Sequence, residues 1–413
     1  MLSPLTISAR DLALLGAGGG DSATMGTLLA GQFSRRVLLV IAVLDSARRK
    51  APGAVRGLEA SYALLSDVQR THPHLVEEIM TLPCAGNWAA ACLRGEAAED
   101  AHQYLACLAA SAAARAGREF RIEVPVLNGA VCLPTLGSWA VDGADATAAV
   151  SGGGDDGLVI TPAAGTPARL PDVGVPAPGW RPARLLRARM DGCELRVWLD
   201  DSGPFRAPPG PRLKPALAAR EAARWQRMLD GAWRSLVRRH RAQADAMSIG
   251  LRALTPLQGR EGPGGDSATA TDAIGGVLLT PPGHAENLAL TLIHELQHTK
   301  LAAVEHIVAL HNGDQLKRYP VRWRNDRRPL GAVLHGAYAH LGVAAYWDSA
   351  LRLGNVYPRE VARRELAYWR DAVEDALELI TESGDLTAAG GQFIAGMATT
   401  LGHFRAITAI SAH

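Results

Sequence analysis

The nine residues LIHELQHTK, from Leu292 to Lys300, decide how this sequence is interpreted. They place His294 and His298 four residues apart in an apolar run that is typical of a helix. With about 3.6 residues per turn, positions i and i+4 lie one above the other on the same helix face, so both imidazoles can reach one metal ion. Glu295 points roughly 100° away around the axis, which favours an orienting or acid–base role over metal binding. The pattern therefore predicts a metal site on a helix.

The residues around this motif are apolar on several sides of the expected helix, so we expect the helix to be buried. A five-residue pattern with three fixed positions also arises by chance, and the two histidines would then only form hydrogen bonds. The helical context that the metal site requires is present and favours the metal interpretation. The apolar positions are Leu288, Leu292, Ile293, Leu296, Leu301 and Val304.

Length and composition indicate a folded protein with a large core. The chain has 413 residues, of which 48% are hydrophobic and 20% charged, and such a chain holds two or three structural units. Lys and Arg number 43 against 41 for Asp and Glu, giving a net charge of +2. Nothing in this balance favours a nucleic-acid or membrane partner.

The cysteines and the N-terminus favour a cytoplasmic location. The five cysteines are odd in number and lack CxxC spacing, which is typical of buried thiols in a reducing compartment. The apolar run from Val37 to Leu44 is too short to span a bilayer. The N-terminus lacks the basic stretch, apolar core and cleavage site of a signal peptide.

Changes of pattern divide the chain into three regions. Residues 1–118 are rich in Ala and Leu, and we expect Gly16–Gly20 to interrupt a helix because the lysine of a phosphate-binding loop is missing. Residues 119–210 contain short alternating runs, and Asp191-Gly192 between two of them predicts a tight hairpin. Residues 211–413 are mainly helical around the motif. The sequence predicts a mostly helical α+β protein, in which a small antiparallel β region separates a helical N-terminal region from a helical metal-binding region with a zincin-like HExxH helix.

The C-terminal region carries three further expectations. Residues 216–247 have one apolar stripe, which predicts a single long helix. Residues 251–257 and 275–279 predict strands, and the second leads directly into the motif helix. A strand beside that helix is suited to docking an extended peptide by edge pairing.

Two histidines do not complete a catalytic metal site. A zinc peptidase would add one ligand, keep one position open for water and use Glu295 as the base. A non-haem iron oxygenase would use three ligands on one face and leave three positions for cosubstrate and oxygen. Glu305 and His306 are disfavoured because they move away from the ion along a continuing helix. The downstream candidates are Glu305, His306, His311, Asp314, His335, His340 and Asp348.

His335 stands out among these candidates because it lies near the start of a second helix-forming run, directly after the tract Trp323–Pro329. That tract contains Arg327 and Arg328, and the planar guanidinium of arginine suits bidentate binding of a carboxylate such as that of 2-oxoglutarate. The alternatives are surface salt bridges for the arginines and an internal helix position for the histidine. Tyr338, about one turn beyond His335, is placed either in the same pocket or in the core.

The chain resembles the HExxH-motif proteins of actinobacterial ribosomal-peptide gene clusters, described as 2-oxoglutarate/HExxH peptide hydroxylases. Three segments carry the resemblance: His294–Lys300, Trp323–Pro329 and Leu334–Ala339. The stretches Gly18–Asp21 and Asn87–Leu93 also look like that family's helical region. The match touches much of the chain, and the first segment is the most specific.

The resemblance implies an iron(II) enzyme that consumes 2-oxoglutarate and O2, releases succinate, and hydroxylates a β-carbon in a ribosomally made precursor peptide. Proteins of that family often act beside a radical SAM enzyme, so the resemblance also implies such an enzyme as a possible pathway partner. By this resemblance His294, His298 and His335 hold the iron, and Arg328, in preference to Arg327, binds the distal carboxylate of 2-oxoglutarate. Glu295 would then orient a ligand histidine or a bound water.

Two other functions stay open. The first is a zinc metallopeptidase of zincin type acting on a peptide, for which Glu295 would be essential and zinc the working metal. The second is a catalytically silent protein that binds a precursor peptide and delivers it to another enzyme. Binding by such a protein would survive the loss of both motif histidines.

Overall fold

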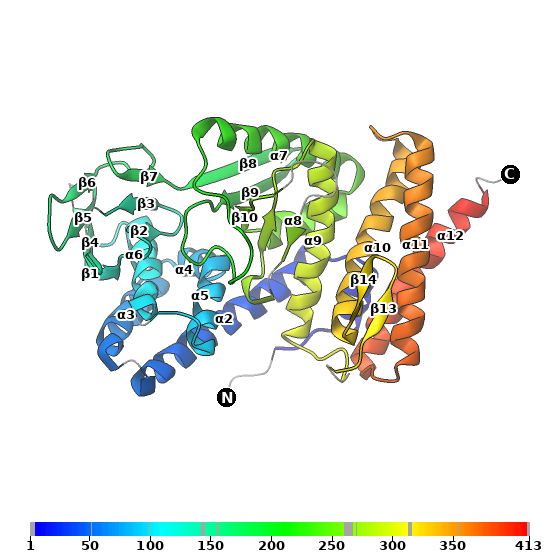
Figure 1. The fold of residues 1–413 in the computed structure, drawn as a ribbon, viewed down its shortest axis with the longest axis horizontal. Coiled ribbons are helices and arrows are strands. Elements are labelled where there is room, and N and C mark those ends of the chain that lie inside the picture. The colour runs from blue at the N-terminus through cyan, green and yellow to red at the C-terminus, as the bar shows by residue number, and fades with distance from the viewer. Residues whose placement is uncertain are drawn as a thin grey trace.

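The computed structural model describes residues 5–50, 52–98, 100–141, 145–154, 157–259, 267–269, 271–312, 316–354 and 356–410. Within these ranges the chain forms twelve α-helices and several small sheets (Figure 1). This confirms the coarse expectation of a mostly helical α+β fold.

The N-terminal region is helical, as predicted. The expected helix break at the glycine cluster is confirmed, because α1 ends at Gly16 and α2 begins at Ser22. Gly18 and Gly20 have φ values of 79° and 138°, which suit glycine and interrupt the helix. Both α4 and α5 start with proline, whose missing N–H costs nothing in the first turn. The helices are α1 (Ala9–Gly16), α2 (Ser22–Lys50), α3 (Val55–Thr71), α4 (Pro73–Met80), α5 (Pro83–Arg94) and α6 (Leu105–Arg115).

Two small antiparallel sheets follow and share a core with α3 to α6. One has the order β1-β4-β5-β6 and the other β2-β3-β7. Burial alternates along β5, which is typical of a strand with one face on the core. The strands are β1 (Phe120–Pro125), β2 (Ala130–Leu133), β3 (Gly137–Ala140), β4 (Thr147–Gly154), β5 (Gly157–Pro162), β6 (Ala168–Leu170) and β7 (Trp180–Pro182).

The central sheet has the order β11-β12-β10-β9-β8. The predicted hairpin at Asp191-Gly192 is confirmed, with positive φ at both turn residues. The sequence did not predict the parallel pairing of β9, β10 and β12. Because β8 and β9 pair with β10, the expected boundary near residue 210 falls within this sheet. The strands are β8 (Arg184–Met190), β9 (Cys193–Leu199), β10 (Ala253–Pro256), β11 (Ser267–Ala268) and β12 (Gly276–Leu279).

The predicted single helix over residues 216–247 is wrong. The structure has α7 (Ala219–Arg239) and α8 (Arg241–Gly250), separated at His240, whose φ of −138° and ψ of 46° leave the helical region. Neither glycine nor proline marks this break. The His240 ring stacks on Tyr346 of a distant helix, with ring centroids 5.0 Å apart, so a tertiary contact accompanies the interruption.

The C-terminal helices lie side by side, with the HExxH helix next to the central sheet and the later helices beyond it (Figure 1). The helix with the HExxH motif, α9, contacts α7 on one side and α10 on the other. Gly342 permits the close approach of α10, because a Cβ there would lie 2.8 Å from the Gln297 side chain. A short hairpin precedes α10 where the sequence suggested only a helix start. The elements are α9 (Ala285–Glu305), β13 (Tyr319–Val321), β14 (Arg324–Arg328), α10 (Leu330–Leu353), α11 (Arg359–Glu382) and α12 (Ala388–Ile410).

Among the described residues, α2 is the one helix whose length and composition would allow it to cross a membrane. This is weak evidence, because core helices of soluble proteins and signal sequences have the same properties. The helix contacts α5, α8 and α9 and buries Gln32 and Arg36 among them. The cytoplasmic location stays a prediction.

Candidate metal centre

The motif histidines point their Nε2 atoms at each other from one face of α9. The two Nε2 atoms, of His294 and His298, lie 3.2 Å apart, and the rings are inclined at 75°. Two imidazole nitrogens about 2.1 Å from one ion at an angle of about 100° would lie about 3.2 Å apart. The spacing of the pair therefore fits a shared first-row metal ion.

Burial keeps both imidazoles neutral. Desolvation lowers the pKa of His294 to about 4. Desolvation also lowers the pKa of His298 to about 3, with a smaller contribution from the neighbouring His294. Neutral imidazole is the form that donates a lone pair to a metal, so at neutral pH the pair is ready to bind one without losing protons.

His335, in the first turns of α10, contacts the pair from the other ring edge. Its Nδ1 lies 3.4 Å from Nδ1 of His298, whereas His294 faces Nε2 of that same ring. Its Nε2 lies 2.8 Å from a carboxylate oxygen of Glu305. The three imidazoles are thus adjacent but do not converge. Within the described ranges, no group of three or more His, Cys, Asp or Glu side chains is arranged to hold a metal ion. The fit to a metal is that of two ligands, with a third nearby.

Glu305 is the residue that sequence reasoning undervalued. It is the last residue of α9, and besides the 2.8 Å contact with His335 its other oxygen lies 3.9 Å from Nε2 of His311. The usable signal was its position seven residues after His298, which returns to nearly the same helix face. The described contacts of Glu305 are with His335 and His311.

Aromatic rings close one side of the histidine cluster. His340 stacks on Trp369 at a centroid distance of 4.2 Å, and Trp323 lies 4.7 Å from the same ring. His340 in turn lies 5.1 Å from the ring of His294. The Trp323 indole packs where Gly336 has no side chain, since a Cβ there would be 2.6 Å from the ring. The hairpin before α10 therefore forms part of the site wall.

Glu295 lies beside the pair rather than in line with it. It is 1% exposed, one of its oxygens accepts a hydrogen bond of 2.6 Å from Thr269, and the other lies 4.0 Å from Nε2 of His294. Thr269 directly follows β11, the edge strand of the central sheet. The carboxylate is thus fixed between the sheet edge and the histidine-bearing side of α9.

The two candidate arginines lie on β14. Arg328 pairs with Asp326 at 2.9 Å, and Arg327 donates to the backbone carbonyl of Arg318 at 3.0 Å. The alternative interpretation expected a surface salt bridge for each arginine. Arg328 forms one, whereas the described contact of Arg327 is with a backbone carbonyl. Tyr338 is fully buried and its hydroxyl donates to the carbonyl of Leu15, so the structure places it in the core.

The remaining downstream candidates have other contacts. His306 faces the amide oxygen of Gln32 at 3.3 Å, and Asp348 pairs with Arg352 at 2.8 Å. Asp314 lies outside the described residues. None of these observations adds a third donor to the pair.

The opposite face of α9 anchors the N-terminal glycine turn. Lys300 is fully buried, and its Nζ donates to the carbonyls of Gly18 and Gly19 at 2.7 and 2.8 Å. Burial lowers the pKa of this amine to about 7. Nothing in the local sequence pattern predicts that Lys300 is buried.

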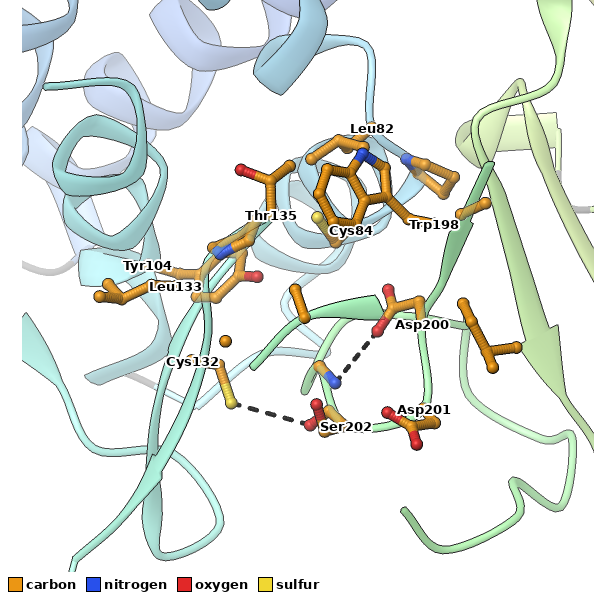
Figure 2. A pocket seen from close by; sticks show the side chains of 17 residues that line it. Leu82, Cys84, Tyr104, Cys132, Leu133, Thr135, Trp198, Asp200, Asp201 and Ser202 are labelled. Atoms are coloured by element: carbon orange, nitrogen blue, oxygen red, sulfur yellow. Dashed lines mark hydrogen bonds between the residues drawn. The ribbon is translucent and has the colours of Figure 1, made fainter. Parts of the chain in front are cut away.

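A separate pocket of about 60 Å³ lies between α5, the β2–β3 hairpin and the end of β9 (Figure 2). Its wall includes Cys84, Tyr104, Trp198 and Asp200. Burial raises the pKa of the Cys84 thiol to about 12 and also raises the pKa of Asp200. All five cysteines are free and buried, as predicted, and such protonated thiols are poor nucleophiles.

A comparison with models of known protein families gives no match for this chain, and a comparison with curated proteins gives none either.

Proposed function

We propose that this chain is an iron(II)- and 2-oxoglutarate-dependent oxygenase that hydroxylates a β-carbon of a ribosomally made precursor peptide. The observation that carries the metal part is the facing pair of neutral imidazoles, 3.2 Å apart at Nε2. The choice of iron and 2-oxoglutarate rests on the family resemblance of the HExxH segment, of Trp323–Pro329 and of Leu334–Ala339.

Iron(II) with 2-oxoglutarate would supply the oxidising chemistry, in which O2 is split between succinate and the hydroxylated product. The roles of this chain follow from its contacts. His294 and His298 would hold the metal, and His335 is the third ligand that the family resemblance implies. It lies at the Nδ1 edge of His298, so its ring would have to turn toward the Nε2 atoms of the pair to reach the same ion. Glu305 contacts the far nitrogen of His335 and would set its tautomer. Glu295, which accepts a hydrogen bond from Thr269, would orient a bound water or the His294 ring.

Arg328 is the proposed partner of the distal carboxylate of 2-oxoglutarate, with Arg327 as the second choice. The Arg328 side chain is 36% exposed and its partner Asp326 is 54% exposed. An exposed ion pair contributes only about 0–1 kcal/mol, so exchange of one carboxylate for another costs little. The same hairpin carries Trp323 into the wall of the histidine cluster.

The substrate would bind as an extended strand along β11. This strand pairs with β12 on one side and ends the sheet order on the other. An edge strand offers unpaired backbone donors and acceptors to a peptide. Because Thr269 follows β11 and contacts Glu295, a peptide paired here would pass beside the HExxH helix.

Anaerobic titration of the apoprotein with Fe(II) and 2-oxoglutarate tests this proposal. We expect a visible charge-transfer band from the chelated keto acid, and we expect His335→Ala to lose it. The exposed His74 provides the matched control, and His74→Ala should keep the band. Absence of the band in the iron-loaded wild-type protein contradicts the oxygenase proposal.

A zinc peptidase is the second candidate, and the position of Glu295 favours it. A carboxylate oxygen 4.0 Å from the metal-facing nitrogen of His294 is suited to accept a proton from a metal-bound water. In that case zinc would support peptide cleavage, and Glu295→Gln would abolish it. For the oxygenase, Glu295→Gln should keep the charge-transfer band, so one variant separates the two functions.

A further inference from the structure

A second polar cluster lies on α2, outside the histidine site. Gln32, Arg35 and Arg36 occupy positions i, i+3 and i+4, which share one helix face. Arg36 is 1% exposed. All three guanidinium nitrogens of Arg36 are buried without a hydrogen-bond partner among the described residues. The same holds for Nη1 of Arg35 and Nε2 of Gln32.

The acceptors near this cluster are already used. Asp272, in the short 3-10 turn η3 (Thr271–Ala273), accepts from Arg35 at 3.1 Å and from Arg94 at 2.7 Å. The amide oxygen of Gln32 faces His306. The cluster therefore has five buried N–H-bearing nitrogens without a hydrogen-bond partner among the described residues, while the oxygens of Asp272 already accept from Arg35 and Arg94.

Such an arrangement destabilises the folded chain. Burial lowers the pKa of Arg36 to about 10, so the guanidinium remains charged at neutral pH. A buried charge without a partner costs on the order of several kcal/mol, and replacing it by an apolar side chain of similar size is often stabilising. Several buried donors without an acceptor indicate a site from which a ligand that supplies the acceptor is absent.

The guanidinium is also held firmly in place. At Gly86 of α5, an added Cβ would lie 2.2 Å from Cζ of Arg36 and 2.0 Å from the carbonyl oxygen of Asp272. Only glycine lets α5 approach this closely, so the Arg36 group lies against the backbone of Gly86. A fixed, planar set of donors suits bidentate binding of a carboxylate.

We infer that Arg35, Arg36 and Gln32 bind a carboxylate of the peptide substrate, an inference that rests on the proposed function for the identity of the ligand. Position carries this step. Asp272 follows Thr269 by three residues, at most about 11 Å along the chain. Thr269 contacts Glu295 at the HExxH helix, and Asp272 contacts Arg35 in the cluster. A peptide running along β11 past the metal site would therefore reach this cluster within a few residues.

The first experiment uses acetate as the probe on the full-length, iron-loaded protein. We expect sodium acetate to raise the midpoint of thermal unfolding of the wild type, whereas acetamide at the same concentration and ionic strength does not. Arg36→Met should abolish the acetate response. It should also raise the unfolding midpoint without acetate, because it removes an unpaired buried charge. Arg35→Met should weaken the acetate response at least threefold and serves as a second variant if Arg36→Met fails to fold. Arg48→Met, on the exposed part of the same helix, is the matched control and should respond like the wild type.

The second experiment uses acetylated and amidated heptapeptides of Thr and Val that carry one Glu or one Gln at successive positions. We expect one Glu position to bind at least tenfold more tightly than its Gln counterpart, and Arg36→Met to erase that difference. If acetate responds while no Glu position is preferred, the site takes a free small carboxylate and the peptide assignment is overturned.

Two further outcomes complete the test. If Arg36→Met lowers the unfolding midpoint and acetate leaves the wild type unchanged, Arg36 serves the fold and the inference is wrong. If Arg36→Met loses the charge-transfer band with 2-oxoglutarate, the cluster serves the cosubstrate instead, which also overturns the peptide assignment. Absence of that band in every protein, with the acetate and Glu preferences intact, contradicts the oxygenase proposal alone and leaves the carboxylate site standing.

Discussion

Lys300 and Arg36 are two buried basic side chains on neighbouring helices with opposite surroundings. Lys300 donates to two backbone carbonyls of the Gly18-Gly19 turn and ties α9 to the N-terminus. Arg36 has no hydrogen-bond partner among the described residues. Both side chains are almost completely buried, so exposure does not distinguish them. The difference is whether the chain itself provides the acceptor, and this separates a structural cation from one poised for a ligand.

At the histidine pair the groups that lack a partner are acceptors instead of donors. If both rings are neutral and carry their proton on Nδ1, the Nε2 lone pairs of His294 and His298 face each other and neither ring can satisfy the other. A cation would satisfy both. Under the two proposals, the histidine pair would bind a cation and the Arg36 cluster an anion, and both lie close to the segment from β11 to η3.

The largest expected effect is at the histidine pair. His298→Ala should lower the affinity for Fe(II) or Zn(II) by more than about 100-fold, since changes in groups that merely support metal ligands already cost about 10–100-fold. Bound metal per chain after equilibrium dialysis measures this effect. His74→Ala is the control. Metal content equal to that of the wild type in His298→Ala would remove the basis for a metal centre.

Lys300→Met provides the counterpart of Arg36→Met. It removes the Nζ donor to the carbonyl of Gly19 in a buried turn, and an unsatisfied buried acceptor costs about 1–3 kcal/mol. We expect the free energy of unfolding to fall by that amount, measured by urea denaturation. The same substitution type at Arg36 should act in the opposite direction. If both variants change the free energy of unfolding in the same direction, then the presence of an acceptor in the chain does not distinguish the roles of Lys300 and Arg36.

The sequence predicted the elements whose signals are local. Asp191-Gly192 is a hairpin turn because both residues tolerate positive φ, and the glycines after α1 stop a helix. The parallel pairing of β9 with β10 was not predictable, because those strands are more than 50 residues apart. The alternation of apolar and polar residues in a strand does not indicate which other strand it pairs with. The break at His240 was missed for a related reason, since its contact with Tyr346 joins residues about 100 positions apart.

The candidate site divides along the same line. The i, i+4 spacing placed both motif histidines on one face of α9 without any knowledge of the fold. The contacts of Glu305 with His335, and of Thr269 with Glu295, join separate elements and have no counterpart in the local sequence. Arg36 is the clearest case. In the sequence it is one of two adjacent arginines on a helix, and only the packing of Gly86 and Asp272 against it makes it unusual.

Arg328 extends the comparison of Lys300 with Arg36 to an exposed side chain that already has an acceptor in the chain. Arg328→Met should leave the free energy of unfolding within about 0.5 kcal/mol of the wild type, because its pair with Asp326 is exposed. If Arg328 binds 2-oxoglutarate, the dissociation constant of the cosubstrate should rise about tenfold or more, which isothermal titration with the iron-loaded protein measures. Arg324→Met, on the same strand, is the control because Arg324 also pairs with Asp326. A tenfold rise in both variants would point to the hairpin as a whole rather than to one guanidinium.

The smallest effect concerns a buried imidazole without a ligand role. Burial lowers the pKa of His240 to about 4, with a smaller contribution from the nearby positive charges of Arg239 and Arg352. The unfolded chain protonates this ring below about pH 6.5, whereas the folded chain does not until about pH 4. Its contribution to stability is therefore complete above pH 6.5 and is lost as the pH falls toward 4, by up to about 1.4 kcal/mol per pH unit for one proton.

His240→Phe keeps a ring against Tyr346 and removes this titration. Other buried histidines still destabilise the protein in acid, so the variant should show a shallower loss of unfolding free energy between pH 6.5 and pH 4.5, not a flat one. Urea denaturation at four pH values in that window measures the slope. Curves that stay parallel to the wild type would mean that the folded protein accepts the His240 proton as readily as the unfolded chain does. His240 would then belong with Lys300 among the groups that the fold accommodates when charged.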